Sequence, residues 1–152
     1  MRLKRQKGAT IVECALVLPL FLMIIFAIMQ FGLLMNNYVM LNNAAVEGAR
    51  LLAKERGYTT PYTDTQNQIL ASLPTMMQTM SITISVGGTP CSSNSTCAGL
   101  LGNSSSQPPP NTQATVSLNY NFMPSVMPST PDSVYGFTMP SQLKSSASEF
   151  VE

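Results

Sequence analysis

Charged side chains are scarce in this chain of 152 residues, where Asp, Glu, Lys and Arg make up 10% of the sequence. A typical soluble domain has roughly 25%. Histidine and tryptophan are absent. Without histidine, the sequence excludes a Ser-His-Asp or Cys-His nucleophile relay and a histidine-ligated zinc site. The length suits one domain, and the net charge of +1 argues against a nucleic-acid partner.

The few charges are unevenly distributed along the chain. Four of the eight basic residues lie within the first seven positions: Arg2, Lys4, Arg5 and Lys7. One acid follows at Glu13, and residues 14–46 contain no charge at all. Within that gap, all but one of the residues 14–35 are apolar or glycine. About 20 such residues span a bilayer as a helix, so residues 14–35 are predicted to be a membrane helix that includes Cys14, Pro19 and Gly32.

The basic cluster predicts the orientation of this helix, because positive residues stay on the cytoplasmic side. The rest of the chain then lies in the periplasm or outside the cell. A cleaved secretory signal is the weaker alternative, since its apolar region is about 7 to 15 residues long. Pro19 removes one backbone hydrogen bond and is expected to bend the helix locally. Cys14 is expected to pack as a small apolar residue.

Helical periodicity continues beyond the apolar run. Apolar or small residues recur at alternating spacings of four and three, at Leu34, Tyr38, Leu41, Ala45, Gly48 and Leu52. No break separates this stretch from the membrane helix, and Gly57 is a natural stop. The sequence therefore predicts one helix over about 12–56, roughly 65 Å long, within a segment 9–57.

Residues 58–152 are rich in Ser, Thr, Asn and Pro and are expected to form the extracytoplasmic domain. The patterns predict a short helix over 64–73, with Pro61 before it, and strands over 81–86, 114–122 and, more weakly, 142–151. A loop with a Gly87-Gly88 turn and the prolines 108–110 should join the first two strands, and 123–140 should be irregular. The expected fold class is α+β, with a small antiparallel sheet against the extramembrane half of the long helix.

Two cysteines, Cys91 and Cys97, fall in the predicted polar loop on the oxidising side of the membrane. A disulfide between them is the preferred interpretation, and two free thiols are the alternative. Two thiolates without histidine or further cysteine do not complete a tetrahedral metal shell, so neither a metal nor a cofactor is expected.

The segment that carries most functional information is Lys7-Gly8-Ala9-Thr10-Ile11-Val12-Glu13, next to the apolar run. A basic leader, a glycine and a glutamate five residues later resemble the class III signal of type IV prepilins. That resemblance implies a leader of residues 1–8, cleavage by a membrane prepilin peptidase between Gly8 and Ala9, and an assembly role for Glu13. A simpler reading of Glu13 places it at the membrane interface in the first helical turn, where the helix dipole favours a carboxylate.

A second stretch extends the resemblance. The sequence GATIVECALVLPLFLMIIFAIMQFG followed by NNAAVEGARLLA is similar to the TadE-like family of Flp/Tad pilus pseudopilins. The family motif falls on Ala44, Ala45, Glu47, Gly48, Ala49 and Arg50. Residues 5–53 carry this specific similarity, and the remaining chain resembles the family in general layout only.

The resemblance implies a minor pilin or pseudopilin in the assembly of a Tad/Flp type IV pilus, with a prepilin peptidase, other pilins and Tad platform proteins as partners. It would be a single-pass protein of the bacterial inner membrane that can enter the pilus. The scattered acids form no general acid/base pair, so neither an enzyme nor a small-molecule substrate is expected. The alternatives are a type II secretion pseudopilin and an uncleaved, membrane-anchored binding or adhesion domain.

Overall fold

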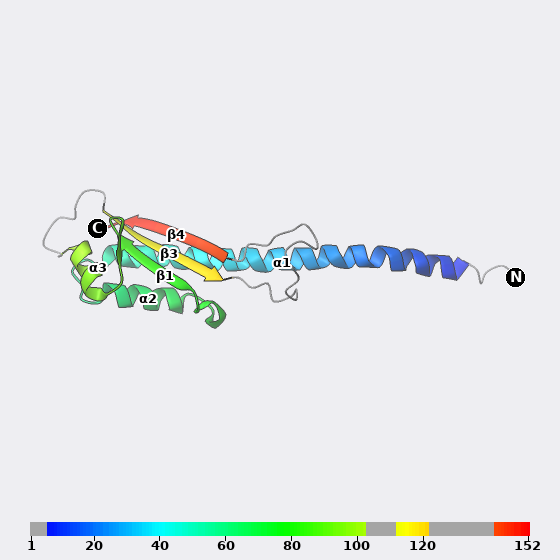
Figure 1. Ribbon diagram of the computed structural model, residues 1–152, viewed down its shortest axis with the longest axis horizontal. Coiled ribbons are helices and arrows are strands. Elements are labelled where there is room, and N and C mark those ends of the chain that lie inside the picture. The colour runs from blue at the N-terminus through cyan, green and yellow to red at the C-terminus, as the bar shows by residue number, and fades with distance from the viewer. Residues whose placement is uncertain (1–5, 103–111, 122–141) are drawn as a thin grey trace. The chain divides into compact units, whose positions relative to one another are not determined.

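The computed structural model describes residues 6–102, 112–121 and 142–152 (Figure 1). These residues form the following elements: α1 (Gln6–Lys54), α2 (Pro61–Ala71), the 3-10 helix η1 (Thr75–Met77), β1 (Ser81–Val86), β2 (Thr89–Cys91), α3 (Asn94–Leu101), β3 (Gln113–Asn121) and β4 (Gln142–Phe150). The chain divides into two compact units, residues 1–36 and 37–152. The predicted α+β class, a long apolar helix followed by a small antiparallel sheet, is confirmed.

Helix α1 is long and apolar enough to cross a membrane, judged by length and composition, from Ile11 onward, and its most apolar window has a mean hydropathy of 2.8. It begins at Gln6, earlier than the predicted residue 12, and ends at Lys54, two residues before the predicted end. Gly57 follows with a positive φ of 83°, a conformation that glycine adopts without steric cost and that ends helices. The helix therefore ends three residues before the predicted stop, and Gly57 lies in the turn that follows it.

The second helix, α2, starts at Pro61 and ends at Ala71, whereas the sequence placed Pro61 before a helix of residues 64–73. Proline suits the first helical position because its φ is already helical and the amide it lacks has no partner there. The helix buries Pro61, Thr65 and Ile69, spaced four residues apart on one face. It ends ahead of Pro74, and η1 follows.

The four strands form one antiparallel sheet in the order β2-β1-β3-β4. The strands predicted over 81–86, 114–122 and 142–151 are confirmed to within one residue. Gly87 and Gly88 join β1 to β2 with positive φ angles of 59° and 80°, as a tight two-residue hairpin turn requires. The predicted irregular connection 123–140 and the prolines 108–110 lie outside the described residues.

The loop predicted between the first two strands is wrong over residues 89–101, where β2 and α3 form. Ser93 caps α3 through a capping box: its hydroxyl accepts from the Thr96 backbone amide at 3.3 Å, and the Ser93 amide donates to Thr96 Oγ1 at 3.1 Å. This arrangement satisfies two helix-end amides. Local capping thus makes a helix of a segment whose polar composition suggested a loop.

One face of the sheet packs on the C-terminal part of α1 and on α2 to form the core of the second unit. The largest fully buried residues are Leu41, Leu52, Ile69, Ile84, Leu101, Leu118, Val86 and Val116. The Ser145 hydroxyl donates to Asn42 Oδ1 at 3.1 Å, and the Glu152 amide donates to the Ala53 carbonyl at 3.4 Å. Strand β4 therefore runs in the same direction as this part of α1, as Figure 1 shows.

Candidate functional site

The proposed processing site, the peptide bond between Gly8 and Ala9, lies in the first turns of α1 because the helix begins at Gln6. Glycine lowers helix stability by about 1 kcal/mol relative to alanine. The sequence predicted the leader boundary at this point and the helix start after it. The structure shows instead that α1 includes the last three residues of the predicted leader, Gln6 to Gly8.

Glu13 lies on α1 with an exposed side chain. Among the residues that the structure describes, the ion pair is Arg50–Glu149, and it does not involve Glu13. Large apolar side chains line α1 around it, and most of those between Ile11 and Met35 are 36% to 78% exposed. Because a soluble protein rarely exposes so large an apolar surface, this part of α1 requires a covering of lipid or of other helices.

The other residues singled out in the apolar run differ in their surroundings. Pro19 lies inside α1. Cys14 is a free, exposed thiol, and a Cβ placed on Gly32 would meet nothing within 4 Å. Gly32 therefore serves no close approach within the described residues.

The small residues of the family motif form a buried seam in the second unit. Ala44, Ala45 and Ala49 are at most 1% exposed, and Gly48 is buried beside them. A Cβ on Gly48 would lie 2.7 Å from Ile69 Cγ1 and 3.6 Å from Val116 Cγ1. The small residues of the motif thus let α1 approach both α2 and β3 closely.

The two charged motif residues lie on the outer side of the seam. Arg50 Nε donates to Glu149 Oε1 at 3.3 Å, with side chains 66% and 42% exposed. Exposed pairs of this kind contribute at most about 1 kcal/mol, so this one adds little to the stability of the fold. Glu47 is exposed.

The predicted disulfide between Cys91 and Cys97 is confirmed, with the two Cα atoms 5.2 Å apart. Both cysteines are almost fully buried, and the bond ties the end of β2 to α3. Asn94 extends this link to α2, because its side chain accepts from the Thr63 amide and donates to Thr63 Oγ1, both at 2.9 Å. The disulfide therefore holds a structural corner of the domain.

A carboxylate pair lies where α1 turns into α2. Burial raises the pKa of Glu55, and the negative charge of Asp64 raises it further. Asp64 itself accepts a hydrogen bond from the Thr60 hydroxyl at 2.7 Å. Sequence reasoning treated these acids as scattered, because only the turn at Gly57 brings them together.

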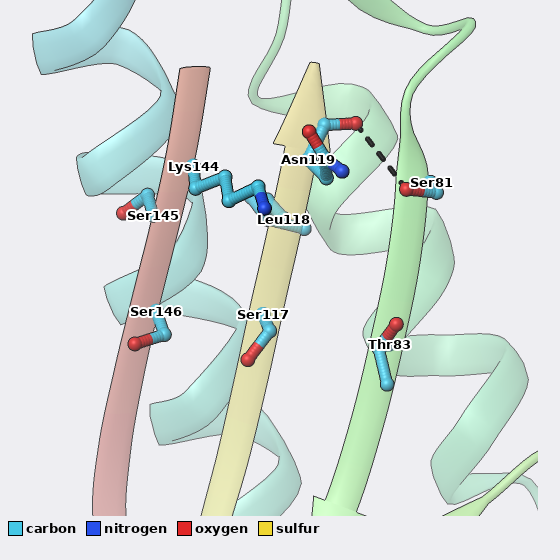
Figure 2. Close-up of a pocket in the computed structure, with 8 residues that line it drawn as sticks. All are labelled: Ser81, Thr83, Ser117, Leu118, Asn119, Lys144, Ser145 and Ser146. Carbon is cyan, nitrogen blue, oxygen red and sulfur yellow. Dashed lines mark hydrogen bonds between the residues drawn. The ribbon is translucent and has the colours of Figure 1, made fainter. Parts of the chain in front are cut away.

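The outer face of the sheet is polar and slightly hollowed, and sequence reasoning did not single it out. Figure 2 shows its lining on β1, β3 and β4: Ser81, Thr83, Ser117, Leu118, Asn119, Lys144, Ser145 and Ser146. The Ser81 hydroxyl donates to the Asn119 carbonyl at 3.4 Å. The hollow has no acid/base pair, and no group of three or more metal-ligating side chains occurs in residues 11–102, 112–121 and 142–152.

Comparison with known proteins connects these features with one family. No curated protein and no solved structure matches the chain. The matched segment contains Gly8, Glu13, the apolar run and the small-residue seam of α1, and it ends at Arg50. Residues 8–50 match the family model of TadE-like proteins, which confirms the resemblance seen in the sequence.

Proposed function

We propose that this protein is a minor pilin or pseudopilin, a structural component in the assembly of a Tad/Flp type IV pilus. The observation that carries the proposal is the N-terminal part of α1. There Gly8 and Glu13 precede a largely exposed apolar run, in a segment that matches TadE-like proteins. The family match by itself supports a more general role, that of a pilin-like component associated with a Tad pilus.

In this proposal, residues 14–35 cross the bacterial inner membrane once. The four basic residues before Gly8 keep the N-terminus in the cytoplasm. The domain 58–152, together with the C-terminal part of α1, lies in the periplasm or outside the cell. The fibre-forming pilins of the family are usually little more than the helix, so the folded domain favours a minor role.

Removal of the leader, residues 1–8, is the step that prepares the protein for assembly. A prepilin peptidase cuts between Gly8 and Ala9 after this first part of α1 opens, and helix ends open readily because they fray. The leader carries four of the eight basic residues and no acid. Its removal takes four cations out of the zone in which neighbouring helices pack.

Cleavage also creates a positive charge that can pair with Glu13 of another copy. The new α-amine of Ala9 has a pKa of about 8 and is positively charged at neutral pH. In a bundle of parallel helices, the amine of one copy pairs with Glu13 of its neighbour. Losing one partner of a buried pair costs about 3 to 5 kcal/mol, enough to select processed chains for assembly.

The mass of the protein isolated from its native membrane tests the proposal. We expect a chain that begins at Ala9, and co-purification with other pilins and Tad platform proteins. A mature chain that begins at Met1 would contradict processing and favour the tethered binding or adhesion domain. A processed chain that co-purifies with a type II secretion platform would favour the secretion pseudopilin.

A further inference from the structure

Charge is segregated along the second unit of the structure. At one end are residues 37–42 of α1, the segment 72–82 around η1, the end of β3 (118–121) and the start of β4 (142–145), which together we call the Asn37 end. This end contains one charged residue, Lys144. The other charged residues described in the unit lie elsewhere: Glu47, Arg50, Lys54, Glu55, Arg56, Asp64, Glu149 and Glu152.

Hydrogen bonds and strand register place these segments together. The Ser145 hydroxyl donates to Asn42 at 3.1 Å, and Ser145 pairs with Leu118, which pairs with Ile82. Ser145, Leu118 and Ile82 thus form one row across the sheet, and the chain segment that precedes Ile82 lies beyond this row. Gln78 Nε2 donates to the Leu70 carbonyl at 3.3 Å and holds η1 against the end of α2.

The Asn37 end also exposes apolar side chains. Met76 of η1 is 84% exposed, Val39 is 54% exposed and Tyr38 is 45% exposed. Tyrosine is enriched at membrane interfaces, because its ring is apolar and its hydroxyl is polar. A long basic side chain keeps its charge at the headgroups while its stem lies along apolar surface. Lys144 is exposed on the sheet face beside Asn119 (Figure 2).

The chain connects this end directly to the predicted membrane helix. The apolar run of α1 ends at Met35, two residues before Asn37. Glu47, the first acid of the unit, comes ten residues, or about 15 Å, further along α1. Among its described residues, the Asn37 end thus offers a bilayer surface several exposed apolar side chains, one cation and no acid.

We propose that the Asn37 end docks on the phospholipid surface, with Met76, Tyr38 and Val39 in the interfacial region and Lys144 near the lipid phosphates. The occupant is a bilayer because the chain leads from the membrane helix directly into residues 37–42 of this patch, and the patch combines apolar side chains with a positive charge. Docking would hold the domain on the membrane before assembly. The inference rests on the membrane anchoring in the proposed function.

The test uses the full-length chain in nanodiscs of phosphatidylcholine and phosphatidylglycerol, with an environment-sensitive fluorophore on Met76→Cys. Cys14→Ser removes the free thiol and leaves the disulfide intact. The matched control carries the probe on Tyr58→Cys, in the turn after α1, where the side chain is 63% exposed. We expect a blue-shifted emission at position 76, quenched several-fold more strongly by headgroup-nitroxide lipids than at position 58.

A second arm tests the charge. The docked fraction, measured by the same quenching, should be larger with phosphatidylglycerol than in phosphatidylcholine alone, and Lys144→Gln should reduce that preference by about fivefold. Equal quenching at positions 76 and 58 would overturn the proposal. So would quenching between labelled copies without quenching by lipid, which would identify a second copy as the occupant.

Flotation of the same chain with liposomes distinguishes membrane anchoring by α1 from docking of the Asn37 end. A chain that floats and shows no quenching at position 76 overturns docking alone and leaves the anchor intact. A chain that does not float overturns both the anchor and the docking.

Discussion

Gly48 of α1 lies against Ile69 of α2 so closely that a Cβ on Gly48 would be 2.7 Å from Ile69 Cγ1. Ile69 is fully buried, and the same Cβ would lie 3.6 Å from Val116 Cγ1, so the isoleucine would have to shift within a packed core. The glycine of the family motif is therefore explained by packing, independently of any assembly role.

Gly48→Ala should destabilise the domain by about 1 to 3 kcal/mol, because overpacking a tight seam costs more than the helix gains from alanine. Urea unfolding of the full-length chain in detergent, followed by tyrosine fluorescence, measures the change. Gly32→Ala is the matched control, since its Cβ would meet nothing within 4 Å. Ile69→Val should recover part of the loss in the double variant. Equal stability of the Gly48→Ala variant and the wild type would contradict the packing argument.

The disulfide supports a second prediction. Replacing Cys91 and Cys97 by serine should lower the free energy of unfolding by about 2 to 4 kcal/mol, because the bond no longer restricts the unfolded chain and two polar hydroxyls enter a buried corner. Unfolding of the variant and of the wild type, with and without reductant, measures the loss. Cys14→Ser should unfold like the wild type, because that thiol is free and exposed. If reductant lowered the stability of the serine double variant as well, the bond would not be the cause.

The strands were predictable from the sequence because alternation is a local signal. Ile84 and Val86 alternate with polar residues and are buried in β1, as a half-buried strand requires. Helix α3 was not predictable in the same way, since CSSNSTC is short and polar and the helix depends on the Ser93 cap and the disulfide. Gly57 predicted the end of α1 to within two residues, whereas the start of α1 at Gln6 lies in a basic stretch without helical periodicity.

The residues of the candidate site were also predictable only where the signal is local in sequence. Gly8, Glu13 and the motif 44–50 are contiguous in sequence, so a local pattern could identify them. Contacts across long separations could not be read from it: Arg50 and Glu149 are 99 residues apart, and Gly48 meets Ile69 only after the chain reverses at Gly57. The packing role of Gly48 therefore became visible only in the structure.

The pKa of Glu55 gives a pH-dependent prediction. Because burial and Asp64 raise this pKa in the folded state, the folded chain binds more protons than the unfolded chain above the ordinary value of 4.5. The free energy of unfolding should therefore fall as pH rises from 4.5 through the raised pKa. Glu55→Gln should remove this part of the slope, and Asp64→Asn should reduce it. Urea unfolding across that pH range measures both variants, and an unchanged slope in Glu55→Gln would assign the effect elsewhere.

Two variants test the proposed processing step and the proposed assembly step one at a time. Gly8→Ala should leave a precursor of full mass in the native membrane, because the peptidase requires glycine before the cut. Glu13→Ala should be cut normally, yet its incorporation into sheared pili should be strongly reduced, because the amine of Ala9 in a neighbouring copy loses its partner at a cost of about 3 to 5 kcal/mol. Intact mass reports the first step and the sheared fraction reports the second. Full incorporation of Glu13→Ala would restrict Glu13 to the simpler role at the membrane interface, where the helix dipole alone favours a carboxylate.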